Sequence, residues 1–318
     1  MQQIIYSILP IFLLIVLGFI AQKVINLRHP IVTFFSKKGI IPQNGWTDVL
    51  NQYALYIALP SLILYSLLST PLNNAISNQI ISFTLISSFV FIALLFLVIK
   101  LFNIKKQFAS TLLLCGYLGN IAYIGFPYLS AIIKGSEPTI SIIIGIHITI
   151  SFTFILYLLE KHLAGNVSPL HIFKKLIAQP LLIAVVVGVL FSITNFSLHP
   201  VILETINMIA KSASPTVLIA LGAFFAKSWS APKHPFQVVL LTFVKLLAFP
   251  LVSFFIAYGW YDISKVTLPL LESTMPIAIT SFALSHRYHL DKQTIGYAII
   301  LSTILSFVTI TVFSGIVL

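Results

Sequence analysis

The sequence predicts an all-α polytopic membrane protein, and three observations carry this prediction. Of the 318 residues, 58% are hydrophobic and only 8% are charged, whereas a soluble domain carries roughly 25% charged residues. The apolar residues form blocks of the length that a helix needs to cross a bilayer, about 20 residues. Most lysines and arginines stand between these blocks. The composition therefore excludes an ordinary soluble domain.

Ten blocks qualify as membrane spans, and we number them in chain order. They cover residues 4–24, 47–70, 79–101, 109–134, 138–162, 172–194, 200–227, 235–260, 264–287 and 291–317. Each block is long and apolar enough to form one membrane-spanning α-helix. The connections are too short for a separate soluble domain.

The basic residues predict how the spans are oriented. Fourteen of the 18 lysines and arginines lie in the connections after odd-numbered spans, two lie in the other connections, and Lys211 and Lys245 lie inside spans. Cytoplasmic loops carry an excess of lysine and arginine, so both chain ends are expected outside. The same distribution explains the net charge of +11, which in a soluble chain would indicate a nucleic-acid partner. No nucleic-acid partner is expected here.

Prolines and glycines recur between the two halves of the chain. The matched positions are Pro10 and Gly18 with Pro180 and Gly188, Pro60 with Pro215, and Pro127 with Pro276. Each copy contains five spans, an odd number, so the second copy enters the membrane from the opposite side. We therefore expect two inverted five-helix repeats, residues 1–163 and 171–318, a plan typical of secondary transporters.

Spans four and nine contain residues that interrupt helices. Span four has three glycines and a proline within twelve residues, and span nine has a proline near its middle; both residue types weaken or break helices. Two broken helices at matching places are expected to cross near the midplane. The second half-helices would then offer free N–H groups and positive dipole ends to an anion. The predicted substrate-binding residues are Gly119, Asn120, Gly125, Pro127, Thr274, Pro276 and Thr280. The alternative is that both prolines are simple kinks and that Asn120 is a helix cap.

Ionisable residues inside the spans are the second set of candidates. A charge at the bilayer centre costs at least ~2.5–3.5 kcal/mol, so each should face the interior and be paired. Glu272, beside the break in span nine, is the candidate proton or cation site. Lys211 and Lys245 would attract an anion, or neutralise Glu204 and Glu272. His147 is either a proton relay or a hydrogen-bonded core histidine.

Patterns typical of enzymes and metal sites are absent from the sequence. There is no HExxH, GxSxG or Walker motif, and all three aspartates sit at span ends. Cys115 is the single cysteine, which excludes a disulfide within the chain. The chain is therefore not expected to be an enzyme or to hold a cofactor or metal.

Four segments resemble the auxin efflux carrier family: Leu9–Phe12 with Gly18, Ala58–Ser61, Gly119–Pro127 and Met275–Ala278. Bacterial members of that family are often labelled malonate or other carboxylate transporters. The resemblance implies a scaffold of spans one, two, six and seven, and a transport unit of the other spans with crossed helices four and nine. It also implies elevator-type movement, homodimers through the scaffold, and a place in the bacterial inner membrane.

The sequence departs from the plant members of the family, which makes auxin doubtful as a substrate. No second proline stands beside Asn120, and the connection between the halves is short. The leading hypothesis is a secondary transporter of a small organic anion, driven by the membrane potential, protons or sodium. Two alternatives stay open: a sodium-coupled relative of bile-acid symporters, and a membrane sensor or lipid-binding protein on the same scaffold.

Overall fold

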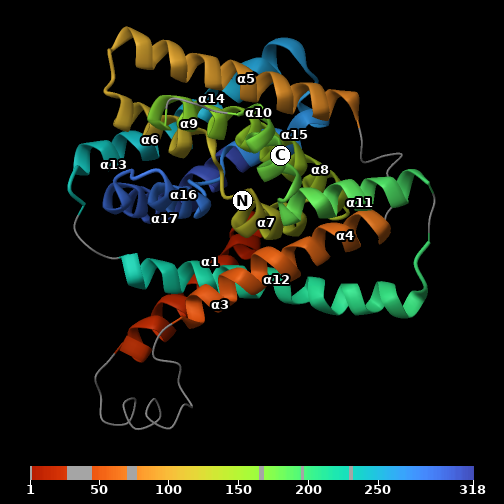
Figure 1. Cartoon of the computed structure of the whole chain (residues 1–318). Helices are drawn as coiled ribbons and strands as arrows, with labels where there is room; N and C mark the ends of the chain where they lie inside the picture. Colours follow the sequence, from red (N-terminus) through yellow and green to blue (C-terminus); the bar gives the residue numbers. More distant parts are fainter. Residues whose placement is uncertain (1, 27–44, 70–76, 165–167, 195–196, 229–231) are drawn as a thin grey trace.

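The protein is helical, as the composition predicts. The computed structural model describes residues 2–26, 45–69, 77–164, 168–194, 197–228 and 232–318. In these residues, helices are joined by short connections, and the β-structure is one isolated bridge (Figure 1). The long connection of residues 27–44, where several predicted cytoplasmic basic residues stand, lies outside the described residues.

The first half of the chain forms helices at the positions of predicted spans one to five. They are α1 (Gln2–Asn26); α3 (Trp46–Tyr53), η1 (Ala54–Ala58) and α4 (Leu59–Ser69); α5 (Asn78–Leu101); α6 (Lys106–Tyr117), then η3 (Ile121–Gly125) and α7 (Phe126–Ile132); and α8 (Glu137–Ile150), η4 (Ser151–Ile155) and α9 (Leu156–Ala164). The η elements are π-helical turns that continue directly into the next helix.

The second half forms helices at the positions of predicted spans six to ten. They are α10 (Pro169–Ile177) and α11 (Pro180–Ile193); α12 (Pro200–Ser228); α13 (Pro235–Phe243), η5 (Val244–Ala248) and α14 (Phe249–Trp260); α15 (Ile263–Ser273) and α16 (Thr280–Arg287); and α17 (Lys292–Val317). Counted as continuous helices, six in the described residues are long and apolar enough to cross a membrane, those of spans two, three, five, seven, eight and ten. The count of ten spans stays a prediction.

Predicted span six is divided where the sequence analysis expects one helix. Helix α10 ends at Ile177, and α11 begins at Pro180. The reason is Pro180, which lacks an N–H and would collide with the carbonyl group four residues earlier inside a helix. The same ring is favourable in the first turn of a new helix. The apolar helix α11 is therefore shorter than the predicted span.

Three of the π-helical turns are explained by prolines. In each case the turn ends two residues before a proline, so that the residue four positions before the proline lies within the turn. A π-helical turn is wider than an α-helical turn, and it leaves room for the proline ring without ending the helix. These pairs are η1 with Pro60, η3 with Pro127, and η5 with Pro250.

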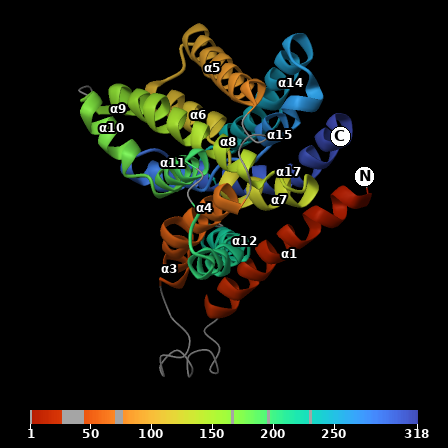
Figure 2. The same cartoon turned by 90° about the vertical axis from the view of Figure 1, so that its right-hand side faces the viewer.

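Apart from α10, which contacts both α9 and α11, the helices form two groups. Helices α1, α3, α4, α11 and α12 pack on one another and form the α12 group. The crossing group comprises α5 to α9 and α13 to α17, and it lies above the α12 group in Figures 1 and 2. Within the α12 group, α1 and α12 approach closely: a Cβ atom on Gly222 would lie 1.8 Å from the carbonyl oxygen of Ile15, and one on Gly18 would lie 2.0 Å from that of Ile219.

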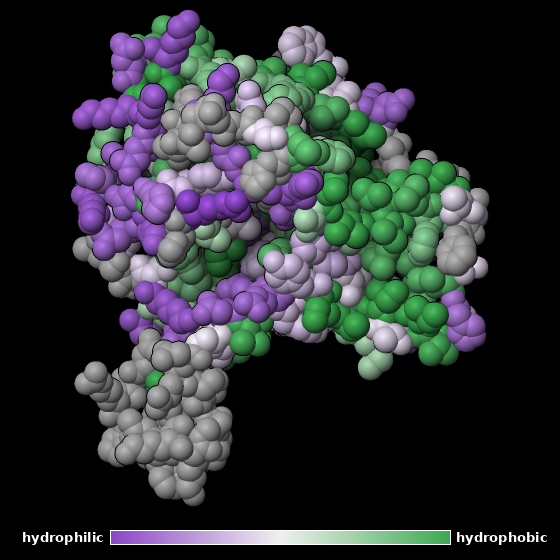
Figure 3. All heavy atoms as spheres, in the orientation of Figure 1, coloured by the Kyte–Doolittle hydropathy of each residue, from purple (hydrophilic) through white to green (hydrophobic). Residues whose placement is uncertain are grey.

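The surface of the molecule is that of an integral membrane protein. Large apolar side chains stay exposed along the outer helices, for example Leu17 of α1, Phe255 of α14 and Val308 of α17. Exposing so many apolar side chains to water would be unfavourable, whereas the hydrocarbon chains of lipids are an apolar environment for them. Hydrophilic residues gather on one side of the face shown in Figure 3, where α12 ends and α13 and α17 begin.

Candidate functional site

The backbone breaks in predicted spans four and nine, after α6 and after α15, lie against each other. Gly119 and Ile277 form an isolated antiparallel bridge. The N–H group of Asn120 donates to the carbonyl oxygen of Pro276 at 2.7 Å, and the N–H group of Ala278 donates to that of Leu118 at 3.0 Å. Much of the backbone that the breaks expose is therefore satisfied by the opposite break. The crossing can stay ordered without solvent, as a site inside a membrane requires.

Asn120 is the best-placed polar side chain at the crossing. The residue is only 2% exposed. Its backbone carbonyl oxygen accepts from the N–H groups of Ile124 and Gly125, both at 3.1 Å. Its side-chain Nδ2 has no hydrogen-bond partner among the described residues. A buried amide without a partner costs about 1–3 kcal/mol, so Nδ2 is a donor available to a ligand.

The two prolines stand differently at the breaks. Pro127 lies in the first turn of α7, which continues directly from the π-helical turn η3, whereas Pro276 lies in the extended segment that precedes Thr280. Pro276 nevertheless acts at the crossing through its carbonyl group. Gly125 allows the close approach of the second break, since a Cβ atom there would lie 3.2 Å from Cγ of Met275.

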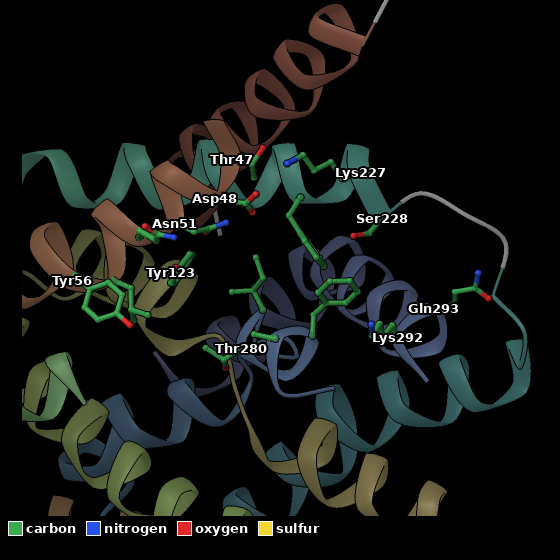
Figure 4. Close-up of a pocket in the computed structure, with 16 residues that line it drawn as sticks. Thr47, Asp48, Asn51, Tyr56, Tyr123, Lys227, Ser228, Thr280, Lys292 and Gln293 are labelled. Atoms are coloured by element: carbon green, nitrogen blue, oxygen red, sulfur yellow. The ribbon is translucent and has the colours of Figure 1, made fainter. Parts of the chain in front are cut away.

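A cleft of about 710 Å³ runs between the α12 group and the crossing group (Figure 4). The α12 group contributes Thr47, Asp48, Asn51, Tyr56, Phe224 and Lys227, and the crossing group contributes Tyr123, Ile279, Thr280, Phe282 and Lys292. Tyr123 and Thr280 place its floor at the starts of the two second half-helices. The positive dipole ends of both half-helices therefore lie beside this cleft. The N–H groups of Ser281 and Phe282 in the first turn of α16 are already bonded to backbone carbonyl oxygens of the preceding residues.

Thr274 and Thr280 differ although both belong to the predicted site. The hydroxyl group of Thr274 is buried and donates to the carbonyl oxygen of Leu271 at 2.6 Å. This hydroxyl group is therefore occupied by a hydrogen bond to the last turn of α15. Thr280 is exposed and lines the cleft, which makes it the threonine that can reach a ligand.

Glu272 and His147 form a buried pair beside the crossing. Nε2 of His147 lies 2.8 Å from Oε2 of Glu272, and both side chains are almost fully buried. The other carboxylate oxygen, Oε1, has no hydrogen-bond partner among the described residues. The aromatic ring of Tyr117 stacks on the imidazole ring with centroids 5.4 Å apart. The histidine that the sequence analysis leaves between two roles is therefore the direct partner of the buried carboxylate.

Lys245 is the second buried charge at the crossing. It is fully buried, and its Nζ donates to the carbonyl oxygen of Tyr117 at 3.3 Å and lies 4.5 Å from the ring centroid of Phe249. Tyr117 is the last residue of α6, so the ammonium group stands at the negative end of this half-helix dipole. Lys245 also interacts electrostatically with Glu272, without an ion pair between them.

Lys211 lies apart from the crossing. It is exposed on α12 and lines a smaller cavity of about 400 Å³, together with Glu137, Asn207 and Ser130. Glu204, which lies one helical turn before Asn207 on α12, accepts a hydrogen bond from the side chain of Asn207 at 3.0 Å. Among the described residues, Lys211 forms no ion pair with Glu204 or with Glu272, so the expectation that it neutralises one of them is not supported.

Several site residues escaped the sequence analysis. Lys227 and Lys292 belong to the basic residues that predict the orientation of the spans, yet both also line the cleft. Tyr117 and Tyr123 flank the break in span four, and apart from that position nothing in the sequence marks them as site residues. Ser302 of α17 accepts from the N–H group of Ile277 at 3.2 Å, a contact that only the packing of α17 against the break creates.

Comparisons with known proteins show that the chain is similar to membrane transporters. A family model described as "Membrane transport protein" matches residues 3–314. A protein of Rhizobium meliloti named "Putative malonate transporter" is 24% identical over 321 residues, which cover 98% of this chain and 95% of that protein. An uncharacterized transporter of Methanocaldococcus jannaschii is 25% identical over 304 residues, 91% of this chain and 95% of that protein.

Proposed function

The chain belongs to the membrane transport protein family, as the resemblance to auxin efflux carriers predicts, and from this premise we propose that it is a secondary transporter of a small organic anion. The family is one of transporters and not of enzymes. The substrate, its binding site and the mechanism belong to the proposal.

One observation carries the proposal: the cleft between the two helix groups has the paired breaks at its floor. Asn120 has an unpartnered amide, which is buried at the crossing and does not line the cleft. Thr280 offers a hydroxyl group in the cleft itself. Helix starts and neutral donors suit a carboxylate, while Lys227 and Lys292 supply positive charge along the walls. The cleft, at about 710 Å³, has room for a carboxylate of the size of malonate. The name of the Rhizobium meliloti relative supports the same class of substrate.

The proposed mechanism is alternating access by movement of the crossing group against the α12 group. Ten membrane spans in two inverted repeats would make the α12 group the scaffold and the crossing group the transport unit. The larger cleft would be the cytoplasmic entrance in this state, and the smaller cavity around Lys211 would lie on the outer side. Both chain ends would then be outside a bacterial inner membrane, and the lipid-exposed scaffold would allow homodimers.

Counterflow in proteoliposomes tests the proposal. Vesicles loaded with unlabelled malonate, succinate or lactate are diluted into the same labelled anion, and uptake is compared with protein-free vesicles. We expect transient accumulation of at least one carboxylate, and its loss in Asn120→Ala. Asn78→Ala is the matched control, because Asn78 is exposed in the first turn of α5 and does not line the cleft.

Other outcomes would favour the alternatives. Uptake that needs sodium and ignores carboxylates would favour a relative of bile-acid symporters. Saturable binding without exchange would favour a sensor or lipid-binding protein. Either result would overturn the proposed carboxylate transport.

A further inference from the structure

We infer that the His147–Glu272 pair binds one proton for each anion carried, so that the protein co-transports protons with its substrate. This inference rests on the proposed function and adds the driving ion and its stoichiometry. The proton adds to Oε1 of Glu272, the carboxylate oxygen that has no hydrogen-bond partner among the described residues. His147 is a positioning residue, because its Nε2–H group holds the other oxygen, Oε2.

The pair is placed to move with the substrate but not to bind it. Glu272 stands two residues before the extended segment that pairs with Gly119 and Asn120. His147 and Tyr117 belong to α8 and α6 of the same helix group. None of the three residues lines the cleft. Proton binding and anion binding can therefore be altered separately.

The buried charges set the stoichiometry. In this inference, Lys245 carries one positive charge and Glu272 one negative charge, and these two charges cancel without substrate. A monovalent anion at the crossing adds one negative charge to a poorly solvated site, which is unfavourable unless it is compensated. One proton on Glu272 restores neutrality. The two binding equilibria must then favour each other reciprocally.

Few other ionisable groups reach the pair. Lys245 and Tyr117 interact electrostatically with Glu272. Helix α15 packs on α5, α7, α8, α14 and α17, and α8 packs on α4 and α11. The other ionisable side chains of these elements do not face the pair. Tyr128 is hydrogen-bonded to Ser314, and Tyr258, Lys100 and Lys265 are exposed. Tyr65 and Glu137 line the smaller cavity, and Lys292 lines the cleft. Tyr297 of α17 stands one turn after Lys292, near the start of its helix.

The test measures accumulation driven by a pH gradient in proteoliposomes whose potential is clamped at zero with valinomycin and equal potassium. Labelled lactate serves as the monovalent probe and malonate as the divalent probe, with protein-free vesicles as the blank for passive diffusion. Wild-type protein should accumulate its substrate about tenfold per pH unit, since one pH unit is the free energy of a tenfold concentration ratio. An imposed potential should change malonate accumulation and leave lactate accumulation unchanged.

Variants separate the proton site from the rest of the protein. Glu272→Gln keeps the shape but cannot take up the proton, so accumulation should fall to the level of equilibration while counterflow exchange persists. His147→Gln keeps a donor for Oε2, so it should retain accumulation with a changed pH profile. Glu204→Gln is the matched control, because Glu204 is exposed on α12 and should behave as wild type.

Two results would overturn the inference. One is wild-type exchange of a carboxylate that a pH gradient cannot drive, which would leave the proposed function intact. The other is full pH-driven accumulation by Glu272→Gln. A wild-type protein that exchanges nothing on the panel overturns the proposed function and this inference together.

Discussion

The ammonium group of Lys245 occupies the space that a side chain at Gly119 would need. A Cβ atom on Gly119 would lie 3.0 Å from Nζ and 3.4 Å from Cε of Lys245. The backbone at Gly119 does not have the positive φ that would itself require glycine. The glycine in this break is therefore explained by packing, and its partner is a buried charge from a helix in the other half of the sequence.

A double-mutant cycle should measure this relationship. Gly119→Val should displace Nζ from the Tyr117 carbonyl group and lower the thermal unfolding midpoint in detergent. Lys245→Ala makes room for the new side chain, so the double variant should cost less than the sum of the single costs, by at least ~1 kcal/mol. The control is Gly259→Val, where a Cβ atom meets nothing within 4 Å and additivity with Lys245→Ala is expected.

The contact between α1 and α12 should be intolerant of any side chain. Gly222→Ala would bring its methyl group to 1.8 Å from the carbonyl oxygen of Ile15 unless the helices separate. Overpacking of this kind costs about 1–3 kcal/mol, so the unfolding midpoint and the yield of folded protein should both fall. Gly259→Ala should leave both unchanged; an equal loss there would show that the effect is not specific to the helix contact.

Thr280 should contribute directly to anion affinity. Thr280→Val keeps the shape but removes the hydroxyl group at the cleft. A hydrogen bond to a charged group is worth about 1.5–3 kcal/mol, so the half-saturating substrate concentration in counterflow should rise about tenfold or more. Thr267→Val is the matched control, because the Thr267 hydroxyl group donates to the backbone of Ile263 within α15. Equal affinities of the two variants would remove Thr280 from the site.

The start of α15 should lose stability in acid. Asp262 accepts hydrogen bonds from the hydroxyl and N–H groups of Ser264 at 2.8 and 3.1 Å, and these bonds hold its carboxyl pKa below the usual value. A lowered folded-state pKa gives stability that is present above the unfolded-state pKa and is lost as the pH falls through the folded value. Asp262→Ala should therefore lower the unfolding midpoint at neutral pH, by an amount that shrinks in acid.

Asp262→Asn separates the titration from the cap. Asparagine keeps a side-chain oxygen that accepts from the N–H group of Ser264 at every pH. This variant should have a flatter midpoint-against-pH curve than wild type over the acid range. Parallel curves for the two proteins would assign the acid sensitivity to another group.

Much of the organisation of this protein could be predicted from its sequence. Apolar blocks of bilayer length predict helices because the bilayer forces every backbone group to bond within its own segment. The glycines of span four and the proline of span nine predict interruptions, because local backbone chemistry decides where a helix can continue. Pro180 carried the same kind of signal, and its effect in dividing span six was missed because the apolar pattern runs on without a gap.

The contacts of the site could not be predicted in the same way. The partners at the crossing, such as Asn120 with Pro276 and His147 with Glu272, are more than 100 residues apart in the sequence. A single sequence gives the type and approximate depth of each side chain, but it does not fix the rotation of one helix against another. Lys211 and Lys245 illustrate the difference: both are lysines inside predicted spans, yet one is exposed beside a cavity and the other is fully buried at the crossing.

The sequence by itself determined the helical class and the positions of the two breaks, because bilayer length and backbone chemistry act locally along the chain. Only the tertiary structure decided that His147 is the partner of Glu272, that Lys245 caps the end of α6, and that Lys227 and Lys292 line the cleft. Those contacts depend on how helices from both halves pack, and close packing selects one arrangement of side chains among many that share the same polar pattern.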